Sequence, residues 1–254
     1  MLEFLRLFYK LILKSRYKVI IKGEDVLLSD STKLVLPNHI SHVDSQIMAI
    51  YLYEYTDFVP VVAEGFFKIP VIKYFLRKLN AVKVINVNKG KRDVDFLKRI
   101  NTQIISAIEN GKSALIFPSG QLSFDGIERI KNKQSAFSVA NLLPDKTKIV
   151  GVRISGLYGS MWSTAWNGKR PEFFSTYLIG IVYFFANLIV FCPRRKITLE
   201  FVDITKEAKE KARVGRKAFN NYLEEFYNSK GPEKPVFIRH LFYFPKIKTK
   251  VVKR

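Results

Sequence analysis

A histidine and an aspartate five residues apart are the side chains of this sequence whose types and spacing could do chemistry. His39 and Asp44 lie in the stretch NHISHVD, which directly follows the apolar run LVLP at residues 34–37. Histidine is the usual general base near neutral pH. A buried carboxylate can fix its tautomer and stabilise the imidazolium that forms. The pair therefore suits removal of a proton from an alcohol, at a strand end that opens into a loop.

The same residues also fit the start of a helix. Ser41 and Asp44 have the spacing of a capping box, with Asp44 in place of the usual Glu or Gln. On that interpretation Ser41 caps a helix from about His42 to Tyr53, and Asp44 favours its positive end. For an isolated pair, the cap is the better supported of the two interpretations. They are compatible, because a cap would hold Asp44 in the first helical turn, facing the loop that carries His39.

A second apolar run also opens into a loop that contains a glycine. Glycine permits tight backbone geometry, and the N–H groups of such a loop can bind an anion or an oxyanion. Taken alone, this stretch has the sequence of an ordinary turn. The run is Ser113–Phe117, and the loop is Pro118, Ser119, Gly120, Gln121, Leu122 and Ser123.

Apolar runs alternate with helical patterns along the chain. At 254 residues, one domain is the default. We expect an α/β fold with a mixed, mostly parallel sheet flanked by helices. The expected strands are Val19–Lys22, Lys33–Leu36, Phe58–Ala63, Ala81–Val87, Ser113–Phe117, Lys148–Ile154 and Ile197–Phe201. The expected helices are Val43–Tyr53, Val71–Leu79, Asp93–Glu109, Gln134–Leu142 and Lys206–Tyr227.

Composition and charge point to a lipid surface. The net charge of +21 implies an anionic partner, either nucleic acid or an anionic membrane. A content of 48% hydrophobic residues with 21 Phe is heavy for a nucleic-acid module, and no motif of that kind is found. We therefore expect an anionic membrane surface and no nucleic acid as partner. The lone Cys192 excludes a disulfide framework, and three His without HExxH predict no metal site.

Two segments predict contact with the bilayer. Residues 1–18 begin MLEFLRLFYKLILK and form a basic amphipathic pattern typical of a membrane-interface helix. Residues 173–192 are apolar and end at a basic stretch, PRRK. Shallow or re-entrant insertion is the expectation here; the alternatives are a buried core helix and a spanning helix, which needs about 20 apolar residues. Residues 231–254 form a basic tail that we expect to pack loosely over the body.

Four blocks in a fixed order resemble those of a known family. The first is NHxxxxD, here Asn38 through Asp44, and the third, usually FPEGTRS, is here Phe117–Ser123. Between them lies Gly65–Pro70, which contains Lys68, and after them lies Val150–Gly156. With these blocks the chain resembles the glycerophospholipid acyltransferases, the group that includes lysophosphatidate acyltransferase. The second half also resembles the acyltransferase portion of fused bacterial acyl-ACP synthetase/2-acylglycerophosphoethanolamine acyltransferases, in Gly156–Ser163, Pro193–Thr198 and Tyr222–Asn228.

The resemblance implies an acyltransferase domain over residues 19–230. It implies transfer of a fatty acyl group from acyl-CoA or acyl-ACP to the free glycerol hydroxyl of a lysophospholipid, of the 1-acylglycerol-3-phosphate or lysophosphatidylethanolamine type. His39 would be the base and Asp44 its orienting partner, with no cofactor besides the thioester co-substrate. We expect the protein to lie at the cytoplasmic face of the bacterial inner membrane, as a peripheral or monotopic protein. The resemblance predicts no oligomeric state. The implied substrate-binding residues are Asn38, Lys68, Lys89, Arg92, Phe117, Pro118, Ser119, Gly120, Gln121 and Ser123.

The sequence departs from the family pattern at positions that the family links to the glycerol phosphate of the acceptor. Ser119 replaces a Glu, Leu122 replaces an Arg, and Asn86 stands nearest to a second Arg. Lys89, Lys91 or Arg92 could substitute for the missing cations. The departures favour a lysophospholipid with a substituted headgroup. They leave open an aminolipid or glycolipid acceptor, or a catalytically degenerate basic protein that binds membrane or nucleic acid, although retention of the His–Asp pair weighs against degeneracy.

Overall fold

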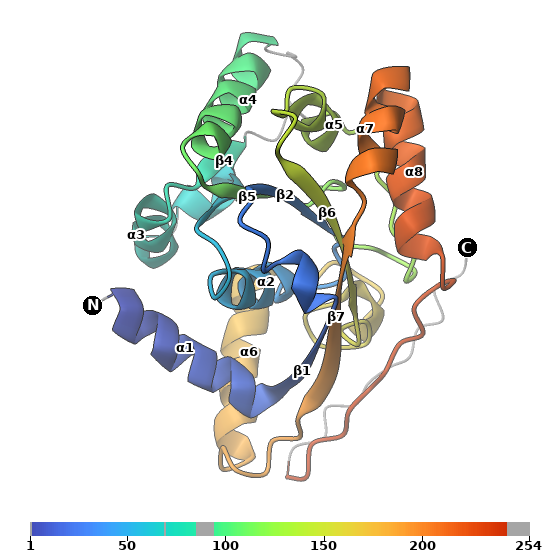
Figure 1. Cartoon of the computed structure of the whole chain (residues 1–254). Helices are drawn as coiled ribbons and strands as arrows, with labels where there is room; N and C mark the ends of the chain where they lie inside the picture. Colours follow the sequence, from blue (N-terminus) through green and yellow to red (C-terminus); the bar gives the residue numbers. More distant parts are fainter. Residues whose placement is uncertain (1, 69, 85–93, 243–254) are drawn as a thin grey trace.

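A seven-stranded sheet forms the centre of the molecule (Figure 1). The structure, a computed structural model, describes residues 2–68, 70–84 and 94–242. The strand order is β1-β7-β6-β2-β5-β3-β4, and all neighbours are parallel except β6 and β7. The expected mixed, mostly parallel sheet is therefore confirmed. The strands are β1 (Tyr17–Lys22), β2 (Lys33–Pro37), β3 (Phe58–Ala63), β4 (Val82–Val84), β5 (Ser113–Leu115), β6 (Lys148–Ser155) and β7 (Arg195–Asp203).

Helices flank the sheet on both sides (Figure 1). The α-helices are α1 (Leu2–Arg16), α2 (Asp44–Leu52), α3 (Pro70–Lys78), α4 (Val94–Glu109), α5 (Ser135–Ala140), α6 (Phe173–Ala186), α7 (Thr205–Val214) and α8 (Arg216–Asn228). Short 3-10 helices are η1 (Glu24–Val26), η2 (Glu64–Lys68) and η3 (Thr164–Trp166).

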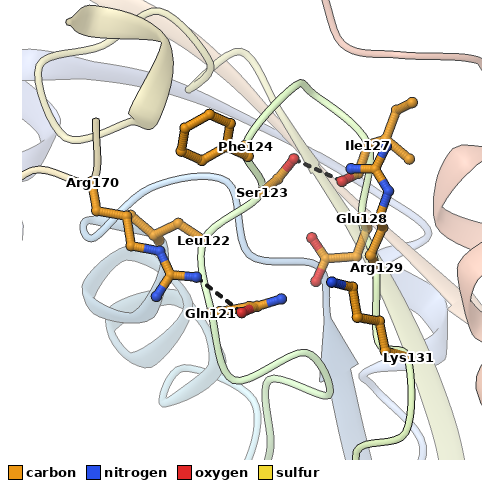
Figure 2. A pocket seen from close by; sticks show the side chains of 9 residues that line it. All are labelled: Gln121, Leu122, Ser123, Phe124, Ile127, Glu128, Arg129, Lys131 and Arg170. Carbon is orange, nitrogen blue, oxygen red and sulfur yellow. Dashed lines mark hydrogen bonds between the residues drawn. The ribbon is translucent and has the colours of Figure 1, made fainter. Parts of the chain in front are cut away.

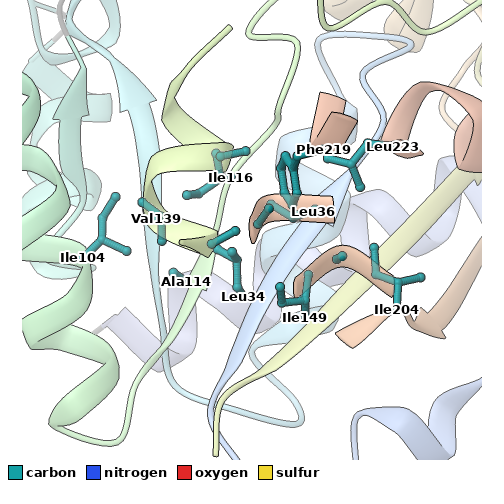
Figure 3. Packing of buried hydrophobic residues seen from close by; sticks show 14 of the residues in the cluster. Leu34, Leu36, Ile104, Ala114, Ile116, Val139, Ile149, Ile204, Phe219 and Leu223 are labelled. Carbon is teal, nitrogen blue, oxygen red and sulfur yellow. The ribbon is translucent and has the colours of Figure 1, made fainter. Parts of the chain in front are cut away.

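The central strand β2 is buried on both faces, which explains its unbroken apolar sequence. Leu34 and Leu36 pack into the core cluster under α4, α5, α7 and α8, part of which is drawn in Figure 3. Val35, which alternates with them, packs on the other face against α1 and α2. Two hydrophobic layers thus hold β2 rigidly, and the loop that follows it begins from a fixed point.

The prediction of a single helix over residues 206–227 is wrong. The segment forms two helices, α7 and α8, because Gly215 between them adopts φ +139°, a conformation that L side chains rarely adopt. Ala208 and Ala212 before the break, and Phe219 and Leu223 after it, are all buried in the same core cluster. The apolar residues keep helical spacing on both sides of Gly215, so the sequence pattern does not reveal the break.

The apolar segment 173–192 forms a helix and then a turn. α6 starts at the Glu172 cap, whose carboxylate accepts the backbone N–H groups of Phe174 and Ser175. It ends at Ala186, and the chain turns through Leu188 and Ile189, both at positive φ. Within the described residues, no helix has the length and apolar character needed to cross a bilayer. Shallow or re-entrant insertion of the segment stays a prediction.

The described part of the C-terminal tail is held to the body by hydrogen bonds rather than packed loosely. Gly156 donates its N–H to the Glu233 carboxylate over 2.6 Å, and Val236 donates its N–H to the Tyr158 carbonyl over 2.9 Å. The stretch runs from the end of α8 toward the turn after α6 (Figure 1), where Phe242 donates its N–H to Asn187.

Candidate active site

The carboxyl ends of β2 and β5 lie side by side because the two strands are parallel neighbours. The stretch with His39 follows β2, and the stretch with Phe117 follows β5. The loop after β6, the other neighbour of β2, lies at the same edge. Ligands of open α/β sheets bind outside the carboxyl ends of strands. The topology therefore brings together two blocks that are far apart in the sequence.

His39 and Asp44 are in contact. The Nδ1 atom of His39 lies 3.2 Å from Asp44 Oδ2, and the aspartate is completely buried while the imidazole keeps 17% of its surface exposed. Since a carboxylate accepts, Nδ1 carries the proton, and the lone pair of Nε2 is free to act as a base. The sequence prediction of an oriented histidine at a strand end agrees with this geometry.

Asp44 stabilises the loop in addition to contacting His39. Its Oδ2 also accepts the backbone N–H groups of Ile40 at 2.5 Å and Ser41 at 2.8 Å, and its Oδ1 accepts the Ser41 hydroxyl at 2.6 Å. Only half of the predicted capping box forms, because the Ser41 hydroxyl donates to Asp44 rather than capping the helix; the structure shows no side-chain cap on α2. The carboxylate wraps the loop around itself.

The backbone of His39 is fixed on both sides. Its carbonyl accepts the N–H of Ser123 over 2.7 Å, and its N–H donates to Glu128 Oε2 over 3.1 Å. The Phe117 ring lies against the imidazole with ring centroids 4.5 Å apart. The loop after β5 therefore supports the histidine directly, which gives the Phe117–Ser123 block a structural role in the site.

The other implied site residues near the dyad are mostly engaged within the protein. The Asn38 amide both donates to and accepts from the backbone of Ile154 in β6, so it anchors the loop. Ser119 is 1% exposed, and its hydroxyl donates to the Gln121 carbonyl. Gly120, at φ +58°, donates its N–H to the Phe117 carbonyl and closes the turn.

The remaining implied residues differ in exposure and in their partners. Gln121 is half-buried and accepts a hydrogen bond from Arg170. Pro118 is buried, and Ser123 donates its hydroxyl to the Ile127 carbonyl. Lys68 is exposed at the end of η2. Lys89 and Arg92, together with the Asn86 position, lie outside the described residues.

His42, the neighbour of the dyad, is a structural group. Its Nε2 lies 3.0 Å from the Pro171 carbonyl, and its ring meets the edge of Phe173. Burial lowers its pKa, which favours the neutral form that can still donate one hydrogen bond. His42 thereby ties the dyad loop to the start of α6.

Glu128 is the residue that the sequence interpretation missed. It is 2% exposed and lies beside the dyad, and burial raises its pKa to about 8, although the Ser119 hydroxyl and the His39 N–H oppose this rise. It follows the Phe117–Ser123 block by a few residues in a stretch with no secondary-structure pattern. An isolated Glu in a loop gives no sequence signal for burial.

A family model described as Acyltransferase matches residues 18–155, more than half of the chain. The match includes His39, Asp44 and the Phe117–Ser123 block. Among solved structures, the chain is similar to the crystal structure of the 1-acyl-sn-glycerophosphate acyltransferase PlsC from Thermotoga maritima. The identity is 20%, the TM-score is 0.51, and the match covers 84% of this chain and 70% of that chain. At this identity the likeness concerns the fold.

The neutral state of Glu128 predicts how stability changes with pH. Between about pH 4.5 and 8 the unfolded chain loses the Glu128 proton while the folded protein keeps it. The free energy of unfolding should therefore fall as the pH rises through this window, by about 1.36 kcal/mol for each pH unit. The variant Glu128→Gln is neutral at every pH, and its urea midpoint should fall less than that of the wild type between pH 5 and pH 8.

The matched control is Glu225→Gln, which changes an exposed carboxylate on α8. Its unfolding profile should follow the wild type at both pH values. Identical pH dependence in wild type and Glu128→Gln would contradict a buried, neutral Glu128.

Proposed function

Because the chain belongs to the acyltransferase family, we propose that it transfers a fatty acyl group from acyl-CoA or acyl-ACP to the free glycerol hydroxyl of a lysophospholipid. The observation that carries the proposal is the contact between His39 and the buried Asp44, with Nε2 free to accept a proton. A degenerate protein without catalytic activity would not need to keep His39 in contact with Asp44.

His39 acts as the general base in the proposed mechanism. Its Nε2 takes the proton of the acceptor hydroxyl as that oxygen attacks the carbonyl carbon of the thioester. Asp44 keeps the proton on Nδ1 and stabilises the imidazolium. When the tetrahedral intermediate collapses, the C–S bond breaks, an ester C–O bond remains, and the imidazolium returns its proton to the leaving thiolate. The alcohol is itself the nucleophile, so no acyl-enzyme and no further cofactor are required.

The proposed acceptor is a phosphate-bearing glycerolipid. The structurally similar PlsC acts on 1-acyl-sn-glycerophosphate, and acceptors of that type or of the lysophosphatidylethanolamine type present the same free glycerol hydroxyl. Three cationic residues, Arg129, Lys131 and Arg170, line a cavity near the dyad, and Arg129 is paired with Asp125. That feature favours an anionic lipid acceptor over a neutral glycolipid.

The acceptor must come from a membrane, and one face of the protein is suited to meet it. We name as the apolar face the exposed apolar residues of α1, of α6 with its following turn, and of the end of the described tail. Arg16 of α1 donates to the Ile189 carbonyl over 2.9 Å and lies 5.0 Å from the Phe184 ring, so these elements lie side by side (Figure 1). The apolar face comprises Leu7, Phe8, Leu11, Phe174, Tyr177, Leu178, Ile179, Ile181, Val182, Phe185, Leu188, Ile189, Val190, Phe191, Leu241 and Phe242.

The apolar face leads to the active site. Phe173, at the start of α6, lies 5.9 Å from the His42 ring and 5.3 Å from the Phe66 ring, measured between centroids. A lipid tail that lies along α6 would therefore reach the dyad loop. Together with the net charge of +21, this supports a peripheral enzyme on an anionic bilayer, at the cytoplasmic face of the bacterial inner membrane.

The first prediction from the proposed function concerns the base. His39→Ala should lower the rate of acyl transfer by at least about 10²-fold, since general base catalysis contributes about 10²–10⁴-fold. The assay follows a labelled acyl group from acyl-ACP or acyl-CoA to a lysophospholipid in mixed micelles. His240→Ala, which changes a histidine that packs on Tyr183, is the matched control and should keep wild-type rates. Full activity in His39→Ala would overturn the mechanism.

The second prediction concerns the orienting carboxylate. Asp44→Asn should lower kcat by orders of magnitude, because an amide can hold the imidazole in the wrong tautomer; the same change in a serine-protease triad lowers kcat about 10⁴-fold. Ser41→Ala removes the partner of Asp44 Oδ1 but leaves the His39 contact, so it should reduce stability more than kcat. Equal losses of kcat in the two variants would argue that Asp44 acts only through the loop.

The third prediction concerns the apolar face. Leu178→Glu and Val190→Glu should each weaken binding to vesicles of phosphatidylethanolamine and phosphatidylglycerol by roughly tenfold or more, because burying one such side chain contributes about 1.5–3 kcal/mol. Val214→Glu alters a similarly exposed apolar residue at the end of α7, a helix on the other side of the sheet (Figure 1), and should bind normally. Vesicle co-sedimentation measures all three, and unchanged binding of Leu178→Glu and Val190→Glu would refute the assignment of this face.

A further inference from the structure

The backbone N–H of His39 finds its partner outside the sheet. Asn38, the residue before it, still donates its N–H to the Val152 carbonyl of β6 over 3.2 Å. The N–H of His39 instead goes to the Glu128 carboxyl group over 3.1 Å, 89 residues further along the chain. Backbone donors inside a protein need a partner. The dyad loop therefore depends on Glu128 at the point where it leaves the strand pairing.

A short turn contacts His39 on both of its backbone groups. Ser123 donates its N–H to the His39 carbonyl over 2.7 Å, and its hydroxyl donates to the Ile127 carbonyl over 2.9 Å (Figure 2). Glu128 follows Ile127, and Figure 2 shows its side chain directed from its own stretch toward the loop that carries Leu122. The turn 123–128 thus closes on itself, and its two ends hold the carbonyl and the N–H of His39.

The carboxyl group of Glu128 is unfavourable for stability at this position. The residue is 2% exposed, and its Oε1 is buried without a hydrogen-bond partner among the described residues. A buried polar atom left unpaired costs about 1–3 kcal/mol, which an apolar side chain of similar size would avoid. The hydrogen bond that the side chain does make goes from the His39 N–H to Oε2. Glu128 therefore has the character of a residue kept for function at some expense of stability.

One face of α8 holds the stretch that carries Glu128. The Asn228 amide joins both backbone groups of Glu128: its Oδ1 accepts the N–H and its Nδ2 donates to the carbonyl, each over 2.9 Å. Glu224 and Asn220 hydrogen-bond the backbone of residues 130–133. These three α8 side chains are spaced four residues apart, so they share one helix face. The stretch 128–133 has no regular structure of its own and takes its position from this helix.

The same helix also contacts the end of β2. Tyr227 donates its hydroxyl to the Leu36 carbonyl over 2.8 Å, three residues before His39. α8 thus fixes the Glu128 stretch relative to the strand from which the dyad loop starts. The helix spans Arg216–Asn228 and lies beyond residues 18–155, which the family model matches.

We propose that Glu128 is a positioning residue of the general base and that α8 holds it against the His39 backbone. The inference rests on the proposed function, which makes His39 the base. Glu128 acts through His39: its Oε2 fixes the peptide from which the imidazole projects, so that Nδ1 stays 3.2 Å from Asp44 Oδ2. A misplacement of about 1 Å in such a site can lower a rate about 10²-fold.

The first experiment separates the hydrogen bond of Glu128 from its volume. Glu128→Leu removes the acceptor and should lower kcat at least about tenfold, while the KM for the lysophospholipid and for the acyl thioester each change less than about twofold. Glu128→Gln keeps an oxygen that accepts the His39 N–H. It is also neutral like the wild type at pH 7, because burial raises the pKa of Glu128 to about 8, so it should keep kcat within about threefold.

The matched control is Glu225→Leu, which changes an exposed carboxylate on α8 and should keep wild-type kcat. Unchanged kcat in Glu128→Leu would overturn the positioning role. Equal losses of kcat in Glu128→Leu and Glu128→Gln would also overturn it, since the two variants differ in the acceptor oxygen.

The second experiment is a double-mutant cycle that tests the role of α8. Asn228→Ala removes both hydrogen bonds to the Glu128 backbone and should lower kcat roughly threefold or more. In the Glu128→Leu background the same change should lower kcat less than about twofold, because the link to His39 is already lost. Asn221→Ala, an exposed residue of the same helix, is the control. Equal losses in both backgrounds would overturn the assignment of α8.

The third experiment observes His39 without turnover. The chain has three His, so nitrogen NMR of the full chain with isotope-labelled histidine in micelles gives few imidazole signals, and His39→Ala assigns those of His39. Wild type and Glu128→Gln should carry the proton on Nδ1, whereas Glu128→Leu should show a mixture of tautomers. If Glu128→Leu does not fold, Asn228→Ala serves in its place.

These spectra separate the two proposals. If the wild type acylates no lysolipid, the proposed function fails, and the NMR comparison still decides whether Glu128 positions His39. A wild-type His39 spectrum in the variant that lacks the support would overturn the positioning role even in an active enzyme.

Discussion

The Asp44 carboxylate is completely buried, and its need for hydrogen-bond partners organises the end of β2. A buried carboxylate without partners is costly, so the loop folds around it and supplies two backbone N–H groups and the Ser41 hydroxyl. The remaining contact goes to His39 Nδ1. Because the same oxygen holds the loop and contacts the histidine, the stability of the loop and the orientation of the imidazole depend on one side chain.

The second carboxyl group at the site, that of Glu128, lacks the hydrogen-bond donors that surround Asp44. Glu128 is buried to a similar degree, yet one of its oxygens has no hydrogen-bond partner in the described part of the chain. Burial then favours its protonated form, with a pKa raised to about 8. Two carboxyl groups close to one histidine thus differ in role because they differ in the donors that surround them.

An apolar face and a polar cavity both lie close to the dyad loop. α6 presents apolar side chains outward and meets the dyad loop through Phe173 and His42. Arg170 precedes α6 by only a few residues and lies at the polar cavity. The start of α6 therefore lies next to the dyad loop, to exposed apolar side chains and to a polar cavity.

The sequence by itself determined the class of fold, the dyad and most of the elements. β3 matches its expected bounds, and the spacing of His39 and Asp44 sufficed because a tight loop after a strand is a local structure. The break at Gly215, the direction of the Ser41 hydrogen bond and the burial of Glu128 were decided by the tertiary structure. Each depends on contacts between distant segments: two helices on one core, and a loop carboxyl group under the His39 backbone. The sequence pattern shows only the periodicity and spacing of residue types. Burial and hydrogen-bond partners are determined when distant segments pack together in the fold.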